Sequence, residues 1–176
     1  MNEILKKDFF RRYGSEGEPL LHRIFRAPEM RFLVSFRKAQ NSKNPLRHFA
    51  LRRRSIKTGI QIPARTKIGE GFYIGHFGRI IINPEAVIGK NVNIATGVTI
   101  GRENRGKREG SPKIGDCVWV GTNAVVVGKI EVGDDVLIAP GAYVNFDVPP
   151  HSVVVGNPGK IIPRENAAEK YIENRV

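Results

Sequence analysis

The stretch INPEAVIGKNVNIATGVTI, residues 82–100, places isoleucine at every sixth position: Ile82, Ile88, Ile94 and Ile100. An amphipathic helix repeats every 3.6 residues and a half-buried strand every two, so neither explains this spacing. A six-residue step is typical of a coil with flat sides that each take six residues. In such a coil the aliphatic side chain points into the stack, and the small residue that often follows lets the chain turn a corner.

The six-residue step continues over some eighty residues. The aliphatic positions are Ile62, Ile68, Ile74, Ile82, Ile88, Ile94, Ile100, Ile114, Val120, Val126, Val132, Ile138 and Val144. The step is interrupted twice, since eight residues separate Ile74 from Ile82 and fourteen separate Ile100 from Ile114. Each rung can bury its apolar side only against its neighbours, so the pattern predicts a solenoid of mainly β structure.

The longer interruption, GRENRGKREGSP (residues 101–112), is polar and basic and predicts a loop, residues 102–112, extruded from the coil. Such a loop is either a tolerated decoration or a functional arm. We favour an arm, because it leaves the coil shortly after the segment that carries His76.

The N-terminal third predicts helices. Apolar residues at helical spacing indicate three or four short helices, with breaks near residues 14–18, at Pro28 and at residues 41–44. We therefore divide the chain into a basic helical segment (residues 1–58), a solenoid domain (59–163) and a C-terminal tail or short helix (164–176).

The net charge of +12 is concentrated in the helical part. Residues 1–60 hold 15 Lys and Arg against 5 Asp and Glu, a balance of +10, whereas residues 61–176 hold 14 against 12, a balance of +2. Such a patch can attract nucleic acid, anionic lipid or an anionic substrate, or can be a solvated helix surface. The sequence carries no aromatic-rich RNA motif, so we expect no nucleic-acid partner and leave peripheral membrane contact open.

Other features indicate a cytoplasmic protein, with the inner membrane face as a further location to test. The chain has no run of about 20 apolar residues, and its start, MNEILKKDFFRRYG, lacks the apolar core of a signal peptide. The single cysteine, Cys117, cannot form an internal disulfide, which fits a reducing compartment.

The repeats resemble the left-handed parallel β-helix of the hexapeptide-repeat acyltransferases. The segments IGHFGRIIINPEAVIG, NIATGVTIG, SPKIGDCVWVG and DVPPHSVVVGNPGKII look like the serine acetyltransferase branch, closest to members that acetylate capsule or exopolysaccharide sugars. The resemblance implies the left-handed coil, the helical segment before it, a homotrimer, and acetyl-CoA as cosubstrate.

The resemblance also implies a role for His76. In this branch the matching histidine is the general base that takes the proton from the acceptor hydroxyl. A neutral imidazole suits this task, because the thioester is already activated and the enzyme need only remove a proton and stabilise the oxyanion. The structural alternative is a histidine satisfied at a turn.

The family's orienting aspartate, fifteen residues before the histidine, is Gln61 in this chain. A glutamine amide can hold one imidazole tautomer but cannot stabilise imidazolium by charge. Glu70 and Glu85 are further candidates, and the sequence does not choose among the three.

The acceptor residues of the serine enzymes are also replaced. Their acid before the histidine and their Arg-His pair before Pro-Lys-Ile become Gly75, Gly110 and Ser111 here. These replacements argue against serine, and Gly75 with Gly78 suggests room for a sugar. We expect an O-acetyltransferase acting on a sugar hydroxyl of a surface-polysaccharide precursor. The alternatives are a serine O-acetyltransferase of cysteine biosynthesis and a non-catalytic hexapeptide-repeat scaffold.

For acetyl-CoA, the resemblance implies that the pantetheine arm approaches the small positions Gly101, Gly121 and Ala139. It implies that Lys160 and Arg164 contact the nucleotide phosphates, where charge-assisted hydrogen bonds are apt. The alternative for both cations is an exposed tail.

We expect no metal. A zinc hydratase with the same solenoid needs three histidines around the ion, and after residue 60 the chain offers His76 and His151.

Overall fold

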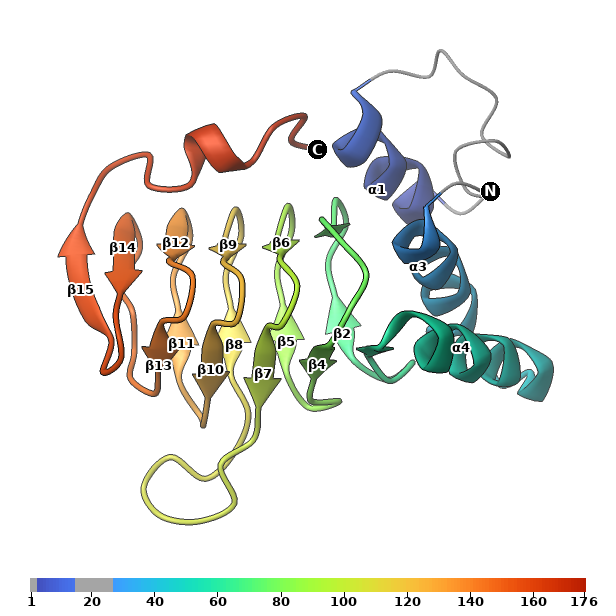
Figure 1. Cartoon of the computed structure of the whole chain (residues 1–176), viewed down its shortest axis with the longest axis horizontal. Helices are drawn as coiled ribbons and strands as arrows, with labels where there is room; N and C mark the ends of the chain where they lie inside the picture. The colour runs from blue at the N-terminus through green and yellow to red at the C-terminus, as the bar shows by residue number, and fades with distance from the viewer. Residues whose placement is uncertain (1–2, 15–26) are drawn as a thin grey trace.

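The computed structural model describes residues 3–14 and 27–176 (Figure 1). Within those ranges the helices α1 (Glu3–Tyr13), α3 (Pro28–Ala39) and α4 (Pro45–Thr58) precede the strands. The helix expected around residues 20–25, with His22, lies outside the described residues. Figure 1 shows the three helices at one end of a long, regular body.

That body consists of short strands in three sheets, with orders β1-β4-β7-β10-β13, β2-β5-β8-β11 and β3-β6-β9-β12-β14-β15. The strands are β1 (Ile60–Gln61), β2 (Lys67–Ile68), β3 (Tyr73–Ile74), β4 (Ile80–Ile82), β5 (Val87–Ile88), β6 (Asn93–Ile94), β7 (Thr99–Gly101), β8 (Lys113–Ile114), β9 (Trp119–Val120), β10 (Val125–Val127), β11 (Glu131–Val132), β12 (Val136–Ile138), β13 (Tyr143–Val144), β14 (Ser152–Val155) and β15 (Lys160–Pro163). A short 3₁₀ helix, η1 (Glu169–Tyr171), lies in the C-terminal tail.

Strands three apart in sequence pair in parallel, as a coil of three sides requires. Val126 pairs with Val144, a step of 18 residues or three sides of six. The step rises to 20 between Ile68 and Ile88 and to 26 between Ile88 and Ile114. The predicted left-handed parallel β-helix with an N-terminal helical region is confirmed.

The core of the coil is the predicted aliphatic stack. Each of its thirteen aliphatic residues is buried, and the most exposed, Ile68, is 7% exposed. A second buried residue follows four positions after many of them, and these are Ala86, Val92, Val98, Val118, Ala124, Val136 and Ala142. Burying one isoleucine side chain contributes roughly 1.5–3 kcal/mol, so the stack is the main source of stability in this part of the chain.

The two interruptions of the six-residue step lie at two different corners. The turn between β3 and β4 is two residues longer than a regular corner and contains His76. The segment between β7 and β8 forms the predicted loop, which projects from the coil in Figure 1. Its base is closed by backbone hydrogen bonds of 2.9 Å in both directions between Glu103 and Gly110.

Helix α4 leads directly into the coil. The Asn44 side chain caps its start by accepting from the Leu46 amide at 2.9 Å, and Pro45 occupies the first turn. Gly59 ends it at φ 74°, and a Cβ there would lie 3.1 Å from the backbone of Gly78. Glycine therefore lets the helix end pack directly against the turn that carries His76.

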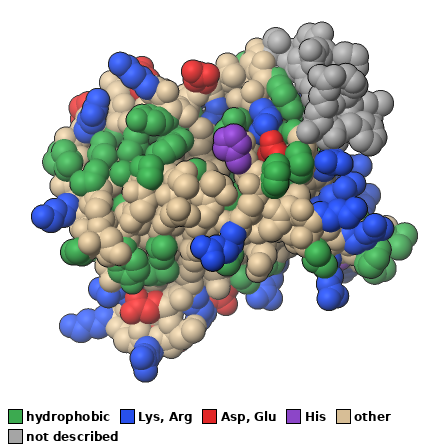
Figure 2. Space-filling view, in the orientation of Figure 1, with side chains coloured by type: hydrophobic (Ala, Val, Ile, Leu, Met, Phe, Trp, Pro, Cys, Tyr) green, Lys and Arg blue, Asp and Glu red, His purple; other side chains and the backbone are tan. Residues whose placement is uncertain are grey.

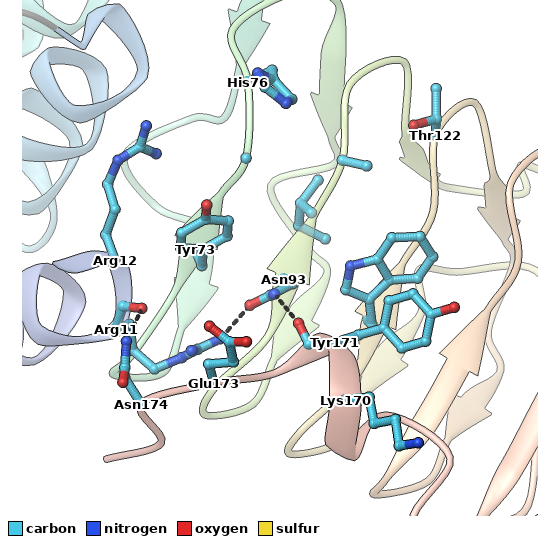
Figure 3. A pocket seen from close by; sticks show the side chains of 14 residues that line it. Arg11, Arg12, Tyr73, His76, Asn93, Thr122, Lys170, Tyr171, Glu173 and Asn174 are labelled. Carbon is cyan, nitrogen blue, oxygen red and sulfur yellow. Dashed lines mark hydrogen bonds between the residues drawn. The ribbon is translucent and has the colours of Figure 1, made fainter. Parts of the chain in front are cut away.

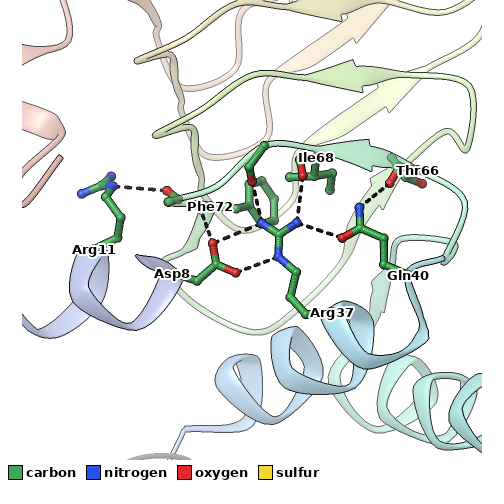
Figure 4. Close-up of polar contacts among 9 residues, drawn as sticks. Asp8, Arg11, Arg37, Gln40, Thr66, Ile68 and Phe72 are labelled. Carbon is green, nitrogen blue, oxygen red and sulfur yellow. Dashed lines mark hydrogen bonds and ion pairs between the residues drawn. The ribbon is translucent and has the colours of Figure 1, made fainter. Parts of the chain in front are cut away.

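A buried ion pair joins the first two described helices to the coil (Figure 4). Arg37 of α3 donates to both carboxylate oxygens of Asp8 in α1, at 2.7 and 3.1 Å, and the two side chains are 1% and 0% exposed. Arg37 also donates to the carbonyls of Ile68 and Gly69 at 2.8 and 2.6 Å, and Asp8 accepts from the Phe72 amide at 2.9 Å. Both buried charges are thus hydrogen-bonded to the first coil.

The C-terminal segment, residues 164–176, returns along the coil to α1 (Figure 1). The Asp135 carboxylate holds its start by accepting from the amides of Ala167 and Ala168, both at 3.0 Å. The His151 ring lies 2.9 Å from the same carboxylate. The expected tail or short helix is present, and its return to α1 was not predicted.

The rest of this segment is tied down at two further points. The Tyr171 ring lies on Trp119 of β9, with 4.8 Å between the ring centroids. At the chain end, Asn91 exchanges two hydrogen bonds with the Val176 backbone, at 2.8 and 2.9 Å. The segment is therefore an ordered wall on the sheet that contains β3, β6 and β9.

We predict that Arg37→Met lowers the free energy of unfolding by about 3–5 kcal/mol at pH 7, because it leaves Asp8 buried and unpaired. Burial already raises the pKa of the Asp8 carboxyl, opposed by Arg37, so the variant should raise it further. A raised folded-state pKa penalises the charged form above the unfolded pKa near 4, so the loss should shrink toward pH 4.

Urea unfolding at several pH values measures this difference. The control is Lys113→Gln, which breaks an exposed pair with Glu131 and should cost less than about 1 kcal/mol. Equal losses in the two variants would contradict the anchoring role of the Asp8–Arg37 pair.

We also predict that docking of the C-terminal segment weakens as pH rises. The hydrogen bond with Asp135 raises the pKa of His151, so its contribution is complete below about pH 6.5 and is lost above the raised value. Burial raises the pKa of Asp135, but hydrogen bonds from the Ala168 amide, His151 and the Ala167 amide lower it overall, so this carboxylate stays ionised.

Hydrogen exchange at the Ala167 and Ala168 amides, corrected for intrinsic rates, should therefore show protection falling in that window. Asp135→Asn should lower the protection at every pH, whereas the surface variant His48→Ala should leave it unchanged. A wild-type pH profile retained in His151→Ala would disprove the linkage.

Candidate functional site

A cavity of about 400 Å³ lies where α1, the sheet of β3, β6 and β9, and the C-terminal segment meet. Figure 3 shows His76 at one end of it and Lys170 and Tyr171 at the other. The cavity thus brings together the start, the middle and the end of the chain.

His76 is exposed at the mouth of this cavity. Gly75, just before it, still follows the regular coil, since its amide donates to the Ile94 carbonyl at 3.2 Å. The longer turn then carries the imidazole outward. Among the described residues, no hydrogen bond or ion pair engages the His76 ring. The alternative that His76 is a structural histidine satisfied at a turn therefore has no such contact to support it. The ring is free to accept a proton from a bound hydroxyl.

The two glycines beside His76 have different surroundings. A Cβ at Gly75 would meet only the Tyr73 ring, at 3.7 Å, and Gly75 lines the cavity. Gly78 has φ 136°, and a Cβ there would lie 2.5 Å from the Thr96 hydroxyl oxygen. Space beside the histidine therefore comes from Gly75, whereas Gly78 allows the turn to pack on the next coil.

Two arginines of α1 form one wall of the cavity (Figure 3). Arg11 is 3% exposed, donates to the Gly71 carbonyl at 3.2 Å, and donates to the Asn93 side-chain oxygen. Asn93 in turn donates to the Tyr171 carbonyl at 2.8 Å. Burial lowers the pKa of Arg11, but an arginine stays charged in the physiological range. This chain of contacts fixes both α1 and the C-terminal segment to Asn93 of β6.

Arg12 lies closer to His76 along the coil. Its guanidinium donates to the Ile74 carbonyl at 2.9 Å, pairs with Glu29, and lies 5.5 Å from the centre of the Tyr73 ring. The Tyr73 ring is thus held under a cation, in the range of a cation–π contact.

The candidate partners of His76 are engaged elsewhere or are not in contact with it. Glu70 pairs with Lys7 and Lys90, at 2.8 and 3.1 Å, and these contacts lower the pKa of Glu70. Glu85 pairs with Arg102. Gln61 is exposed on β1, where it pairs with Ile81. Within the described chain, none of the three candidates is hydrogen-bonded to the His76 ring.

The other acceptor positions lie at the base of the extruded loop. The Gly110 amide bonds back to Glu103, and the Ser111 hydroxyl donates to the Asn83 side-chain oxygen at 3.1 Å. Neither residue lines the cavity of His76. The structure therefore does not bring the two halves of the expected acceptor region together within one chain.

Packing explains part of the small-residue pattern assigned to coenzyme A. A Cβ at Gly121 would lie 2.6 Å from the Pro140 backbone nitrogen, and one at Gly101 would lie 3.2 Å from Val127. The amides of Gly121 and Ala139 donate within the coil, to Ile138 and Val154 at 2.8 Å each. These N–H groups are therefore already used.

Lys160 and Arg164 are exposed, as a role at a phosphate requires. Lys160 begins β15, opposite Val155, and the Arg164 amide donates to the His151 carbonyl at 2.8 Å. Their backbones are fixed while their side chains are accessible.

Two other chemistries receive little support from the geometry. Burial raises the pKa of the Cys117 thiol, which disfavours the thiolate that a nucleophile requires. In the described part of the chain, no group of three or more His, Cys, Asp or Glu side chains is arranged to hold a metal ion.

Sequence reasoning missed much of the cavity wall. Arg11, Arg12 and Tyr171 line it, and their local sequence carries no motif that indicates this. The two arginines of α1 entered the sequence analysis only through the net charge, and the short C-terminal segment offers no periodic signal.

The comparisons with known proteins agree with this fold. Residues 111–145 match the family model described as bacterial transferase hexapeptide (six repeats). A serine acetyltransferase of Helicobacter pylori strain 26695 is 41% identical over 108 residues, covering 61% of this chain and 63% of the relative. Across the curated relatives compared, this chain spans between 29% and 63% of their length.

Solved structures extend the similarity to most of the chain. Soybean serine acetyltransferase, as the apoenzyme, has a TM-score of 0.75 at 30% identity and covers 92% of this chain and 70% of its own. The Neisseria gonorrhoeae serine acetyltransferase in complex with serine has a TM-score of 0.73 at 27% identity, covering 91% and 68%. On this evidence the chain belongs to the hexapeptide-repeat transferase family.

Proposed function

We propose that this protein is an acetyl-CoA-dependent O-acetyltransferase in which His76 is the general base for direct transfer. The observation that carries the proposal is the exposed, unengaged His76 ring at the mouth of a cavity, on a corner two residues longer than the regular repeat. The acetyltransferase names of the relatives support the reaction class.

The reaction needs few groups from the protein. His76 takes the proton as the acceptor oxygen attacks the thioester carbonyl, and a tetrahedral oxyanion forms. When this intermediate collapses, the carbon–sulfur bond breaks, and the imidazolium returns the proton to the leaving thiolate. Gly75 leaves space for the acceptor next to the ring, and Lys160 and Arg164 supply cations for the phosphates of the donor.

For the acceptor, two candidates remain, and we place L-serine first. The relatives are named serine acetyltransferases, and one similar structure was solved with serine. A sugar hydroxyl of a polysaccharide precursor, the acceptor expected from the sequence, comes second. Gly75 favours it, because a glycine stands where the serine enzymes carry the acid that precedes the histidine.

The proposal also includes the oligomeric state of the protein. We propose a homotrimer, since Gly110 and Ser111 lie away from His76 in one chain and a neighbouring copy can supply the missing half of an acceptor site.

We predict that His76→Ala lowers the rate of acetyl transfer by about 10²–10⁴-fold, the usual contribution of a general base. The measurement is release of free thiol from acetyl-CoA in the presence of an acceptor. Thermal unfolding and coenzyme binding should stay as in the wild type, because the ring is exposed and makes no contact that holds the fold. The matched control, His48→Ala, removes another exposed histidine away from the cavity and should retain the rate. An unchanged rate in His76→Ala would remove this residue from the chemistry.

The acceptor is decided by a second experiment. Thiol release with L-serine is compared with release in the presence of hexoses, N-acetylhexosamines and uronic acids, and we predict the highest turnover with serine. Turnover with sugars alone would favour the second candidate. Coenzyme binding without transfer to any acceptor would favour the non-catalytic scaffold.

A further inference from the structure

Helix α4 exposes large apolar side chains to solvent. Leu46, Phe49 and Ile56 are 74%, 60% and 75% exposed, among the most exposed apolar residues of the described chain. On the opposite side, Leu51 and Thr58 are buried. A helix turns 100° per residue, which places Phe49, Arg53 and Ile56 nearly opposite Leu51 and Thr58.

Helix α4 is also strongly cationic, and Arg52, Arg53 and Lys57 lie on the same side as Phe49 and Ile56. Residues 43–58 contain six Lys or Arg and no Asp or Glu. Within the described residues, none of these six cations forms an ion pair, although the structure pairs cations such as Lys7, Lys90 and Lys113 elsewhere. We define the α4 face by six exposed side chains on the side away from Leu51 and Thr58, which are Leu46, Phe49, Arg52, Arg53, Ile56 and Lys57.

Figure 2 shows this face as blue and green side chains side by side, at the end of the molecule where α4 lies. These cations differ from Arg11 and Arg12 of α1, which turn inward onto coil carbonyls and Asn93. The charge on the α4 face is therefore available to a partner.

We propose that the α4 face binds the surface of an anionic lipid bilayer. Exposed aromatic and aliphatic side chains between cations are typical of helices that lie in the headgroup region of such membranes. Each cation near an anionic surface adds about a fivefold gain in binding. Packing the α4 face against the same face of a second copy would bring like charges together without acids to balance them.

The binding is peripheral. Within the described ranges no helix combines the length and apolar content of a membrane span. Phe49 and Ile56 enter the headgroup region, while Arg52, Arg53 and Lys57 contact the lipid phosphates. The proposal goes beyond the proposed function and uses none of the residues around His76.

The experiment measures partition of the full chain onto sedimented vesicles. Vesicles of phosphatidylglycerol and phosphatidylcholine should bind the protein, binding should weaken with salt, and vesicles of phosphatidylcholine alone should bind little. The variant Arg52→Gln/Arg53→Gln/Lys57→Gln should lose roughly a hundredfold in partition, at about fivefold per cation. The control Lys67→Gln/Lys113→Gln/Lys129→Gln removes the same charge from exposed positions on the coil and should bind as the wild type. Equal losses in both triple variants, or no binding by the wild type, would overturn the proposal.

A second measurement reports insertion directly. In Phe49→Trp, emission from the new indole should be quenched by brominated phosphatidylglycerol beyond the quenching of the wild type, in which the tryptophan is Trp119. Absence of added quenching would contradict insertion. Light scattering tests the alternative that a second copy of the chain covers the α4 face. It measures the mass of the variant Leu46→Ser/Phe49→Ser/Ile56→Ser. A smaller oligomer than the wild type would identify the α4 face as a contact between copies and would also overturn the proposal.

Discussion

The inward stack of aliphatic side chains permits six residues on each side of the coil. Any additional residue has to leave the coil at a corner, because the inward positions above and below are already paired in register. Two additional residues produce the turn of His76, and eight produce the loop at 102–112. The corner with two additional residues can therefore hold a side chain that takes no part in the packing of the repeat. His76 lies at this corner.

A cavity beside that corner requires walls that the repeat cannot supply. The buried Asp8–Arg37 pair fixes α1 and α3 on the carbonyls of the first coil, and Arg11 then reaches Asn93 on the second. Asn93 in turn donates a hydrogen bond to the Tyr171 carbonyl in the C-terminal segment. Each of these polar groups is hydrogen-bonded to a backbone carbonyl or an amide. These hydrogen bonds offset the desolvation cost of burying Arg11 and Arg37. The helical segment thus acts on the site through positioning.

The period of the aliphatic residues was sufficient to predict the coil, because each inward residue is decided by local spacing. The same period marked the longer corner of His76 and the extruded loop. The cavity walls could not be predicted in this way. Contacts such as Arg11 with Asn93, or Asn91 with Val176, join residues more than eighty positions apart, and nothing in either local sequence indicates the other. Small residues are an ambiguous signal as well, since close packing between coils also accounts for Gly78 and Gly121.

The basic charge of the N-terminal third also divides in a way that composition does not show. In α1 and α3, Arg11, Arg12 and Arg37 are turned inward, where they pair with Asp8 or Glu29 or donate to coil carbonyls. In α4, Arg52, Arg53 and Lys57 face solvent beside Phe49 and Ile56. One set therefore contributes to the architecture of the cavity and should tolerate little change. The other set faces solvent and contributes nothing to the core, and the proposed membrane contact rests on it. A net charge of +10 on one segment is the sum of two physical roles, and only the burial of individual side chains separates them.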